Sequence, residues 1–217
     1  MTIPFITSLI NLLANFTEVR WGRLKDFGEY LFGWLGSRDG YKVLSNEIEL
    51  EIIDNKGEIA HYRKRKNIQF LQNNVHSYLD TAWGDGDVFA DYKCSQGKAV
   101  DFYEEGYRNR ILISLRETRQ RGDKQEFYIQ RTIKNGYMDE DGYLQTDITY
   151  RTKYLQMRVI FPNNRYPKIV QIIEKNRKRT VKLDREHFMV LPDGRYQIEW
   201  EKKNPRLHEG YIMSWNW

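Results

Sequence analysis

The residues best suited to binding chemistry in this sequence are basic side chains, and two short runs of them stand out. The first run occupies residues 63–66, and the second, residues 177–179, follows a segment that reads as a β-strand. Arginine offers a planar fork of donors that matches phosphate and carboxylate oxygens, so clustered arginines favour an anionic ligand. The residues that we predict to form an anion-binding face are Arg63, Arg65, Arg158, Arg165, Arg177, Lys178 and Arg179.

Aromatic side chains in expected loops could add stacking or clamping contacts to such a face. The 217-residue chain contains 15 Tyr, 10 Phe and 6 Trp. An aromatic ring in a loop can stack on a nucleic-acid base or close over a small ligand. The candidate contact residues are Trp83, Tyr103, Tyr107, Tyr137 and Tyr143. They are compatible with a small anionic ligand and with sequence-independent binding of nucleic acid.

The charge of the chain is unevenly distributed along its length. Residues 151–182 contain ten Lys or Arg and one acid, a net charge of +9, although the whole chain carries only +5. Residues 80–105 contain seven acids and two bases, a net charge of −5. The basic stretch therefore has two interpretations. It binds an external anion, or it pairs with the acidic stretch within one chain or between two chains.

The remaining chemistry-bearing residues form no recognisable catalytic or metal-binding pattern. The four histidines are far apart in the sequence and lack the close spacing of metal-ligand pairs. Cys94 is the only cysteine and carries no family signature, so we expect an inert thiol. No phosphate-binding loop or dinucleotide fingerprint is present. We therefore predict no catalytic residue, no metal and no cofactor, and a protein that is not an enzyme.

The basic stretch 151–182 is itself predicted to be a β element. Residues 154–161 alternate two sets of side chains, with Leu155, Met157 and Val159 on one face, and this period of two is typical of a half-buried strand. Pro162 cannot extend a central ladder and should end the strand. A second strand is expected at 169–173.

The rest of the chain from residue 41 onward also reads as β-structure. A hairpin is expected around the turn at 54–57 and another around 192–195, while 75–79 is ambiguous between a strand and one helical turn. The terminal segment 211–217 carries two tryptophans, so we expect it to be an internal strand. These signals predict a mainly β protein in which residues 41–217 form one antiparallel β-sandwich or partly open barrel.

Residues 1–40 are predicted to form an amphipathic helical segment before this domain. The segment 1–17 is uncharged, but its polar residues make it too polar for a transmembrane span, and no secretory signal is expected. Its apolar stripe, which we name the docking helix, consists of Ile6, Leu9, Ile10, Leu13 and Phe16. The stripe could pack on the β-domain, pair with another chain or lie on a membrane surface.

These observations lead to one leading hypothesis and two alternatives. The leading hypothesis is a non-enzymatic binding or sensing module whose β-sandwich recognises an anionic ligand or an acidic protein surface. In this hypothesis the N-terminal helix serves docking to a protein partner or self-association. The alternatives are a peripheral membrane effector that uses the helix, and a nucleic-acid-binding protein. The solitary cysteine favours a cytoplasmic setting, with peripheral membrane contact as a second option.

Overall fold

The computed structural model describes residues 40–82, 87–105 and 108–217, and the predicted N-terminal helical segment lies outside them. Residues Asp39–Trp217 form one compact unit. The described residues are mainly β, which confirms the predicted class, and they form three sheets. Every pair of neighbouring strands is antiparallel except β1 and β9, which run parallel.

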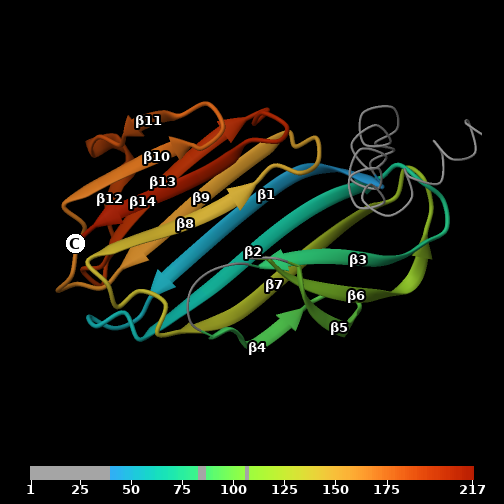
Figure 1. Cartoon of the computed structure of the whole chain (residues 1–217), viewed down its shortest axis with the longest axis horizontal. Coiled ribbons are helices and arrows are strands. Elements are labelled where there is room, and N and C mark those ends of the chain that lie inside the picture. Colours follow the sequence, from blue (N-terminus) through green and yellow to red (C-terminus); the bar gives the residue numbers. More distant parts are fainter. Residues whose placement is uncertain (1–39, 83–86, 106–107) are drawn as a thin grey trace, which may run out of the picture. The chain divides into compact units, whose positions relative to one another are not determined.

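The strands are arranged as one large sheet and two small ones (Figure 1). The seven-stranded sheet has the order β12 (Phe188–Val190), β13 (Tyr196–Lys203), β9 (Tyr154–Phe161), β1 (Tyr41–Ile52), β2 (Ile59–Phe70), β7 (Lys124–Lys134), β4 (Asp87–Cys94). The four-stranded sheet has the order β11 (Arg179–Lys182), β10 (Ile169–Glu174), β14 (Gly210–Asn216), β8 (Asp141–Asp147). The three-stranded sheet has the order β3 (Val75–Ala82), β6 (Arg108–Arg119), β5 (Lys98–Glu105). The single 3-10 turn among the described residues is η1 (Arg185–His187).

Both small sheets cover the same face of the large sheet, and a separate apolar core lies under each. The first core joins β1, β2, β9 and β13 to the four-stranded sheet, and the second joins the other ends of β1, β2 and β7 to β3 and β6. The long strands β1, β2 and β7 run beneath both small sheets (Figure 1). The fold is thus a sandwich whose second layer is divided into two parts.

A bulge in β1 keeps its inward side chains on one face across both cores. The register between β1 and β2 shifts between Val43 and Ser45, where one extra residue interrupts the ladder. Tyr41 and Val43 are buried before the bulge, and Ile48 and Leu50 are buried after it. Successive strand residues point to opposite faces, so residues 41 and 43 share a face with residues 48 and 50 only because one extra residue is inserted between them.

Several predicted strands have the expected position, one ambiguous segment is resolved, and one expected loop is a strand. β9 has the predicted bounds, and β14 lies between β10 and β8 as an internal strand. The ambiguous segment 75–79 is part of strand β3 and not a helical turn. Tyr103, which we expected in a loop, lies on strand β5, and β4 precedes it as a further strand. Their strand geometry is stabilised by pairing with β7 and β6, which a local pattern cannot reveal.

Gly142 is required where β8 passes over a buried tryptophan. It faces Trp215 in the ladder between β8 and β14, and a Cβ atom there would lie 2.5 Å from the indole ring. Trp215 is buried and contacts the rings of Tyr137 and Phe161, so the indole has no room to retreat. The absence of a side chain at residue 142 therefore permits the close packing of these two strands.

We expect Gly142→Ala to lower the free energy of unfolding by about 2–3 kcal/mol, because overpacking a closed core forces neighbouring atoms apart. Urea unfolding measures the loss. Gly40→Ala is the matched control, since a Cβ atom at Gly40 meets no atom within 4 Å, and it should change stability by less than about 0.5 kcal/mol. Equal stabilities of the two variants would contradict the described packing of Trp215.

Candidate ligand-binding site

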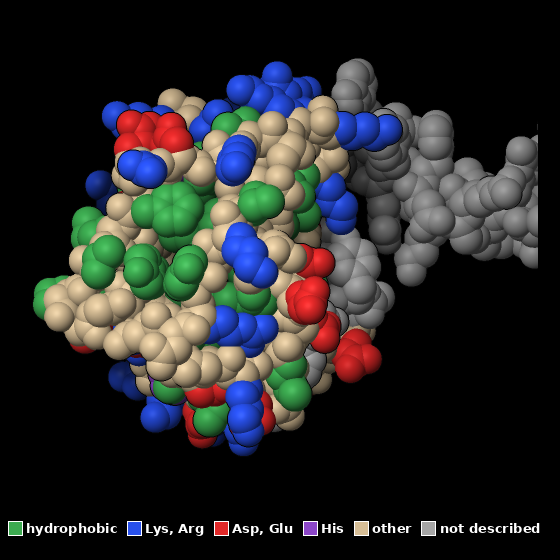
Figure 2. Space-filling model, turned by 90° about the vertical axis from the view of Figure 1, so that its left-hand side faces the viewer, with side chains coloured by type: hydrophobic (Ala, Val, Ile, Leu, Met, Phe, Trp, Pro, Cys, Tyr) green, Lys and Arg blue, Asp and Glu red, His purple; other side chains and the backbone are tan. Residues whose placement is uncertain are grey.

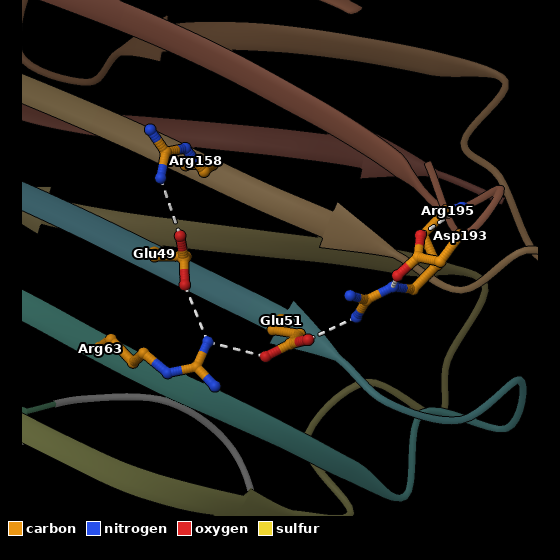
Figure 3. Close-up of polar contacts among 6 residues, drawn as sticks. All are labelled: Glu49, Glu51, Arg63, Arg158, Asp193 and Arg195. Atoms are coloured by element: carbon orange, nitrogen blue, oxygen red, sulfur yellow. Dashed lines mark hydrogen bonds and ion pairs between the residues drawn. The ribbon is translucent and has the colours of Figure 1, made fainter. Parts of the chain in front are cut away.

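The outer face of the large sheet carries a chain of ion pairs that involves two of the predicted anion-binding residues (Figure 3). Glu49 accepts hydrogen bonds from Arg63 at 2.8 Å and from Arg158 at 2.9 Å. Glu51 accepts another from Arg63 at 2.7 Å and also pairs with Arg195. Burial alone would raise the pKa of Glu51, but the bonds from Arg195 and Arg63 hold that pKa below its usual value. These arginines therefore link neighbouring strands through carboxylates.

The other predicted basic residues lie in different places. Arg65 pairs with Glu126 at 2.9 Å on an exposed part of the large sheet, and together with Arg63 and Arg158 it lines a shallow groove. Arg165 lies 4.0 Å from the ring of Trp217 and donates to backbone carbonyls of three other residues. Arg177 pairs with Glu174, while Lys178 and Arg179 are exposed next to it. On the face drawn in Figure 2, basic side chains are dispersed among apolar and acidic ones.

The remaining predicted residues have mixed outcomes. Tyr137 and Tyr143 line the same cavity, which is described below, whereas Tyr103 is exposed on β5. Trp83, Tyr107 and the docking helix (Ile6, Leu9, Ile10, Leu13 and Phe16) lie outside the described residues. Within the described part of the chain, no helix is long and apolar enough to span a membrane.

A row of polar residues faces inward on the large sheet, between the parts that the two small sheets cover. On β2, Lys64 and Lys66 occupy the inward positions between Tyr62 of the first core and Ile68 of the second. Side chains along β2 alternate between the two faces without interruption, so Lys64 and Lys66 point to the same face as the apolar residues. Two amines are therefore held on the core side of the sheet.

The neighbouring strands contribute polar residues at the same boundary. On β7, Arg131 lies between Ile129 of the second core and Ile133 of the first. On β1, Asn46 is the inward residue just before Ile48 and pairs in register with Lys66. Asn46, Lys64, Lys66 and Arg131 form a diagonal row across three strands, which we call the polar seam.

Asp80 of β3 faces the polar seam from the three-stranded sheet. Its carboxylate accepts a hydrogen bond from the amine of Lys64, and both side chains are buried. Burial would raise the pKa of Asp80, but Lys64, and then Arg131 and Lys66, hold that pKa below its usual value. Burial would likewise lower the pKa of Lys64, yet the attraction of Asp80 raises it. This pair is therefore charged on both sides at neutral pH.

Lys66 has a different environment from Lys64. Its amine lies 5.6 Å from the ring centre of Tyr41 and 5.5 Å from that of Tyr78, while Asp80 is bonded to Lys64. Burial, followed by repulsion from Lys64, lowers the pKa of Lys66 to about 7, and Asp80 opposes this shift. Burial also keeps the Tyr41 and Tyr78 phenols protonated by raising their pKa values. Lys66 thus gains or loses its proton close to neutral pH.

A cavity of about 190 Å³ opens onto the polar seam. Its walls come from β1, β2, β3, β6, β7, β8 and the loops before and after β8, and they include Tyr137 and Tyr143. Two buried polar atoms of its lining, Nε of Arg131 and Oδ1 of Asn46, have no hydrogen-bond partner among the described residues. The basic and acidic side chains of the lining are Lys64, Lys66, Arg110, Arg131, Asp80 and Asp147.

The lining has an excess of basic groups and spare donors. The lining contains two carboxylates and four basic side chains, and the Lys64 amine already donates a hydrogen bond to Asp80. The guanidinium of Arg131 lies 4.1 Å from the ring of Tyr62, and its Nε has no hydrogen-bond partner among the described residues. Since a buried charge is costly unless it is paired, this lining is suited to a small ligand with one acidic group.

The described residues give little support for a metal centre. Ligand atoms of Asp184, Glu186 and His187 lie within 4.8 Å of one another around η1. The two acids are exposed, and His187 is 3.9 Å from Asp184. Such exposed groups commonly cluster without an ion, so this turn carries no argument for a cofactor.

The sequence contained a signal for the polar seam that the prediction did not use. Lys64 and Lys66 are in phase with apolar residues at 60, 62, 68 and 70, and Arg131 is in phase with Phe127, Ile129 and Ile133. A basic residue at an otherwise apolar position of a strand indicates an inward charge. Asp80 gave no such signal, because its partner is set by the packing of two sheets.

The buried pair predicts a large effect when its acid is neutralised. We expect Asp80→Asn to lower the free energy of unfolding by about 3–5 kcal/mol, because it leaves the buried Lys64 ammonium without a carboxylate. Glu126→Gln breaks the exposed pair with Arg65 and should cost less than about 1 kcal/mol. Urea unfolding of both variants at pH 7 measures the difference. A small and equal loss in both variants would contradict the burial of the pair.

Lys66 predicts a specific pH dependence of stability. Its pKa is about 7 in the folded chain and 10.5 in an ordinary lysine, so between these values the unfolded chain holds a proton that the folded chain has released. The contribution of Lys66 to the free energy of unfolding therefore rises with pH across this window. Lys66→Met should remove that rise, which amounts to about 4 kcal/mol between pH 6 and pH 10.

Unfolding curves between pH 6 and pH 10 test this expectation. Lys124→Met is the control, because Lys124 is exposed on β7 and its removal should leave the pH dependence unchanged. If the Lys66 and Lys124 variants follow the same pH curve, Lys66 does not have a lowered pKa.

Comparisons with known proteins identify a similar fold and no family. No family model and no curated protein matches the chain. Its structure is similar to a crystal structure of a putative protease from Parabacteroides distasonis ATCC 8503, with a TM-score of 0.52 and 9% identity over 82% of this chain and 40% of that one. Legionella pneumophila aminopeptidase A in complex with aspartic acid gives a TM-score of 0.46 and 8% identity, over 80% of this chain and 21% of that one. The chain spans less than half of either protein, and the first likeness concerns the fold alone.

Proposed function

We propose that this protein is a non-enzymatic binding or sensing module that holds a small anionic ligand in the cavity at the polar seam. The observation that carries the proposal is the excess of basic groups around a cavity whose lining contains the unpartnered Nε of Arg131. In this proposal the predicted N-terminal helix serves docking or self-association, as the sequence suggested. In this proposal the site presents a bound ligand to a partner and performs no catalytic step.

The charge of the site favours an anion over a neutral ligand. The Lys64 ammonium is paired with the Asp80 carboxylate, so neither of these two charges needs a ligand as its partner. Arg131 is buried, lines the cavity and keeps a donor without a partner among the described residues. A carboxylate or phosphate oxygen against this guanidinium would accept a charge-assisted hydrogen bond, which is shorter and stronger than a neutral one.

The size of the cavity favours a ligand of a few heavy atoms. Pockets for drug-sized ligands usually enclose about 300–1,000 Å³, and this cavity encloses about 190 Å³. Tyrosine side chains in its wall can contact an apolar part of the ligand with the ring and a polar part with the hydroxyl group. A small organic acid or a phosphate matches these features better than a nucleotide or a peptide does.

The peripheral membrane and nucleic-acid alternatives rest on other residues. The membrane alternative depends on the docking helix, which lies outside the described residues. The nucleic-acid alternative depends on exposed arginines, and Arg63 and Arg158 bond to carboxylates of the large sheet. No specific contact of the described residues favours either alternative, and both stay predictions.

Calorimetric titration of the full chain with phosphate and with lactate, at constant ionic strength, tests the proposal. We expect saturable binding that Arg131→Met weakens about tenfold or more, because a hydrogen bond to a charged group contributes about 1.5–3 kcal/mol. The matched control replaces the exposed cluster Arg177, Lys178 and Arg179 with Ser and should leave the affinity unchanged. Loss of binding in the control and not in Arg131→Met would place the anion on the exposed cluster and contradict the proposal.

A further inference from the structure

We propose that the ligand of the polar seam carries a carbonyl group beside its acidic group, and that Lys66 holds this carbonyl carbon as an imine. The ligand class is therefore a small oxo acid. This inference rests on the proposed function, because the acidic group must first be held in the cavity. It adds a covalent bond to a site that would otherwise bind by charge alone.

Lys66 differs from its neighbour in how its amine is used. The Lys64 amine donates to Asp80 in a buried ion pair, which fixes its proton and its position. The Lys66 amine lies over the rings of Tyr41 and Tyr78, and no carboxylate of the described residues is within ion-pair distance. Lys66 also lines the cavity, so its amine is accessible to a bound ligand.

The chemical state of this amine suits addition to a carbonyl. With a pKa of about 7, about half of the Lys66 amines are unprotonated at pH 7, whereas an ordinary lysine is unprotonated in fewer than about one molecule in a thousand. A neutral amine is nucleophilic, and lysines beside another cationic group commonly form imines with carbonyl substrates. Lys64 is that cationic group here.

Three other groups line the same cavity as Lys66. Arg131 on β7 lines the same cavity and brings a guanidinium charge for the acidic group, and Asn46 on β1 pairs in register with Lys66. Asp80 on β3 is held as a carboxylate by Lys64, so it keeps the neighbouring ammonium in place and does not compete for the carbonyl. An oxo acid has its carbonyl carbon next to its carboxylate, which matches the small volume of the cavity.

The bond formation is balanced without any other reactant. The Lys66 nitrogen adds to the carbonyl carbon, and a proton from nitrogen moves to the former carbonyl oxygen. The second nitrogen proton is then lost as the carbon–oxygen bond breaks, so one water leaves and a carbon–nitrogen double bond forms. No electron is gained or lost, and hydrolysis reverses the step and frees the ligand.

Reductive trapping of the full chain with pyruvate and sodium cyanoborohydride at pH 7 tests the inference. We expect one adduct by intact mass, located on Lys66 by peptide mapping and formed at least tenfold faster than any adduct on Lys124. Lys66→Met should abolish this adduct, Arg131→Met should slow its formation, and Lys124→Met, which removes an exposed amine of β7, should leave it unchanged. The labelling rate at Lys66 should rise through pH 7, whereas that at Lys124 should rise only near pH 10.

Lactate separates this inference from the proposed function, because it has the carboxylate of pyruvate and a hydroxyl group in place of the carbonyl. If lactate binds in an Arg131-dependent manner but pyruvate gives no adduct on Lys66, the imine is refuted and the anion site stands. If lactate does not bind and no adduct forms, both proposals fail. Adducts that spread over exposed lysines in proportion to their exposure would also refute the imine.

Discussion

The buried ion pair between Lys64 and Asp80 is the interaction on which the arrangement of the described sheets depends. It connects β2 of the large sheet to β3 of a small one at the point where neither apolar core extends. A sandwich with an undivided second layer would cover this row with apolar side chains. Here the second layer is divided, and the inward charges are tolerated because each has a carboxylate, an aromatic ring or a polar cavity beside it.

The two faces of the large sheet use charge in different ways. On the outer face, Glu49 and Glu51 alternate with arginines from neighbouring strands, and partly solvated pairs of this kind contribute modestly to stability. On the inner face, the basic groups outnumber the acids and surround a cavity. Arginine content alone therefore does not locate a binding site. What distinguishes the inner group is burial together with donors that the described residues leave unpaired.

The fold could be predicted further from the sequence than the site. Alternation in 154–161 defined β9, and the terminal tryptophans indicated that β14 is internal, because both are local signals. The expected loop at Tyr103 is instead part of β5, because that strand depends on pairing with β6. Among predicted site residues, Tyr137 and Tyr143 do line the cavity, whereas the polar seam depends on register across three strands and on which sheet covers it.

The central claim is that the polar seam holds a small acidic molecule in the working protein. The most direct measurement is native mass spectrometry of the full chain purified gently from its own host, followed by mass analysis of what denaturation releases. We expect a bound acidic molecule of a few heavy atoms that is absent from the Arg131→Met variant purified in the same way. The same bound molecule in both proteins, or none in the wild-type protein at saturating phosphate, would contradict it.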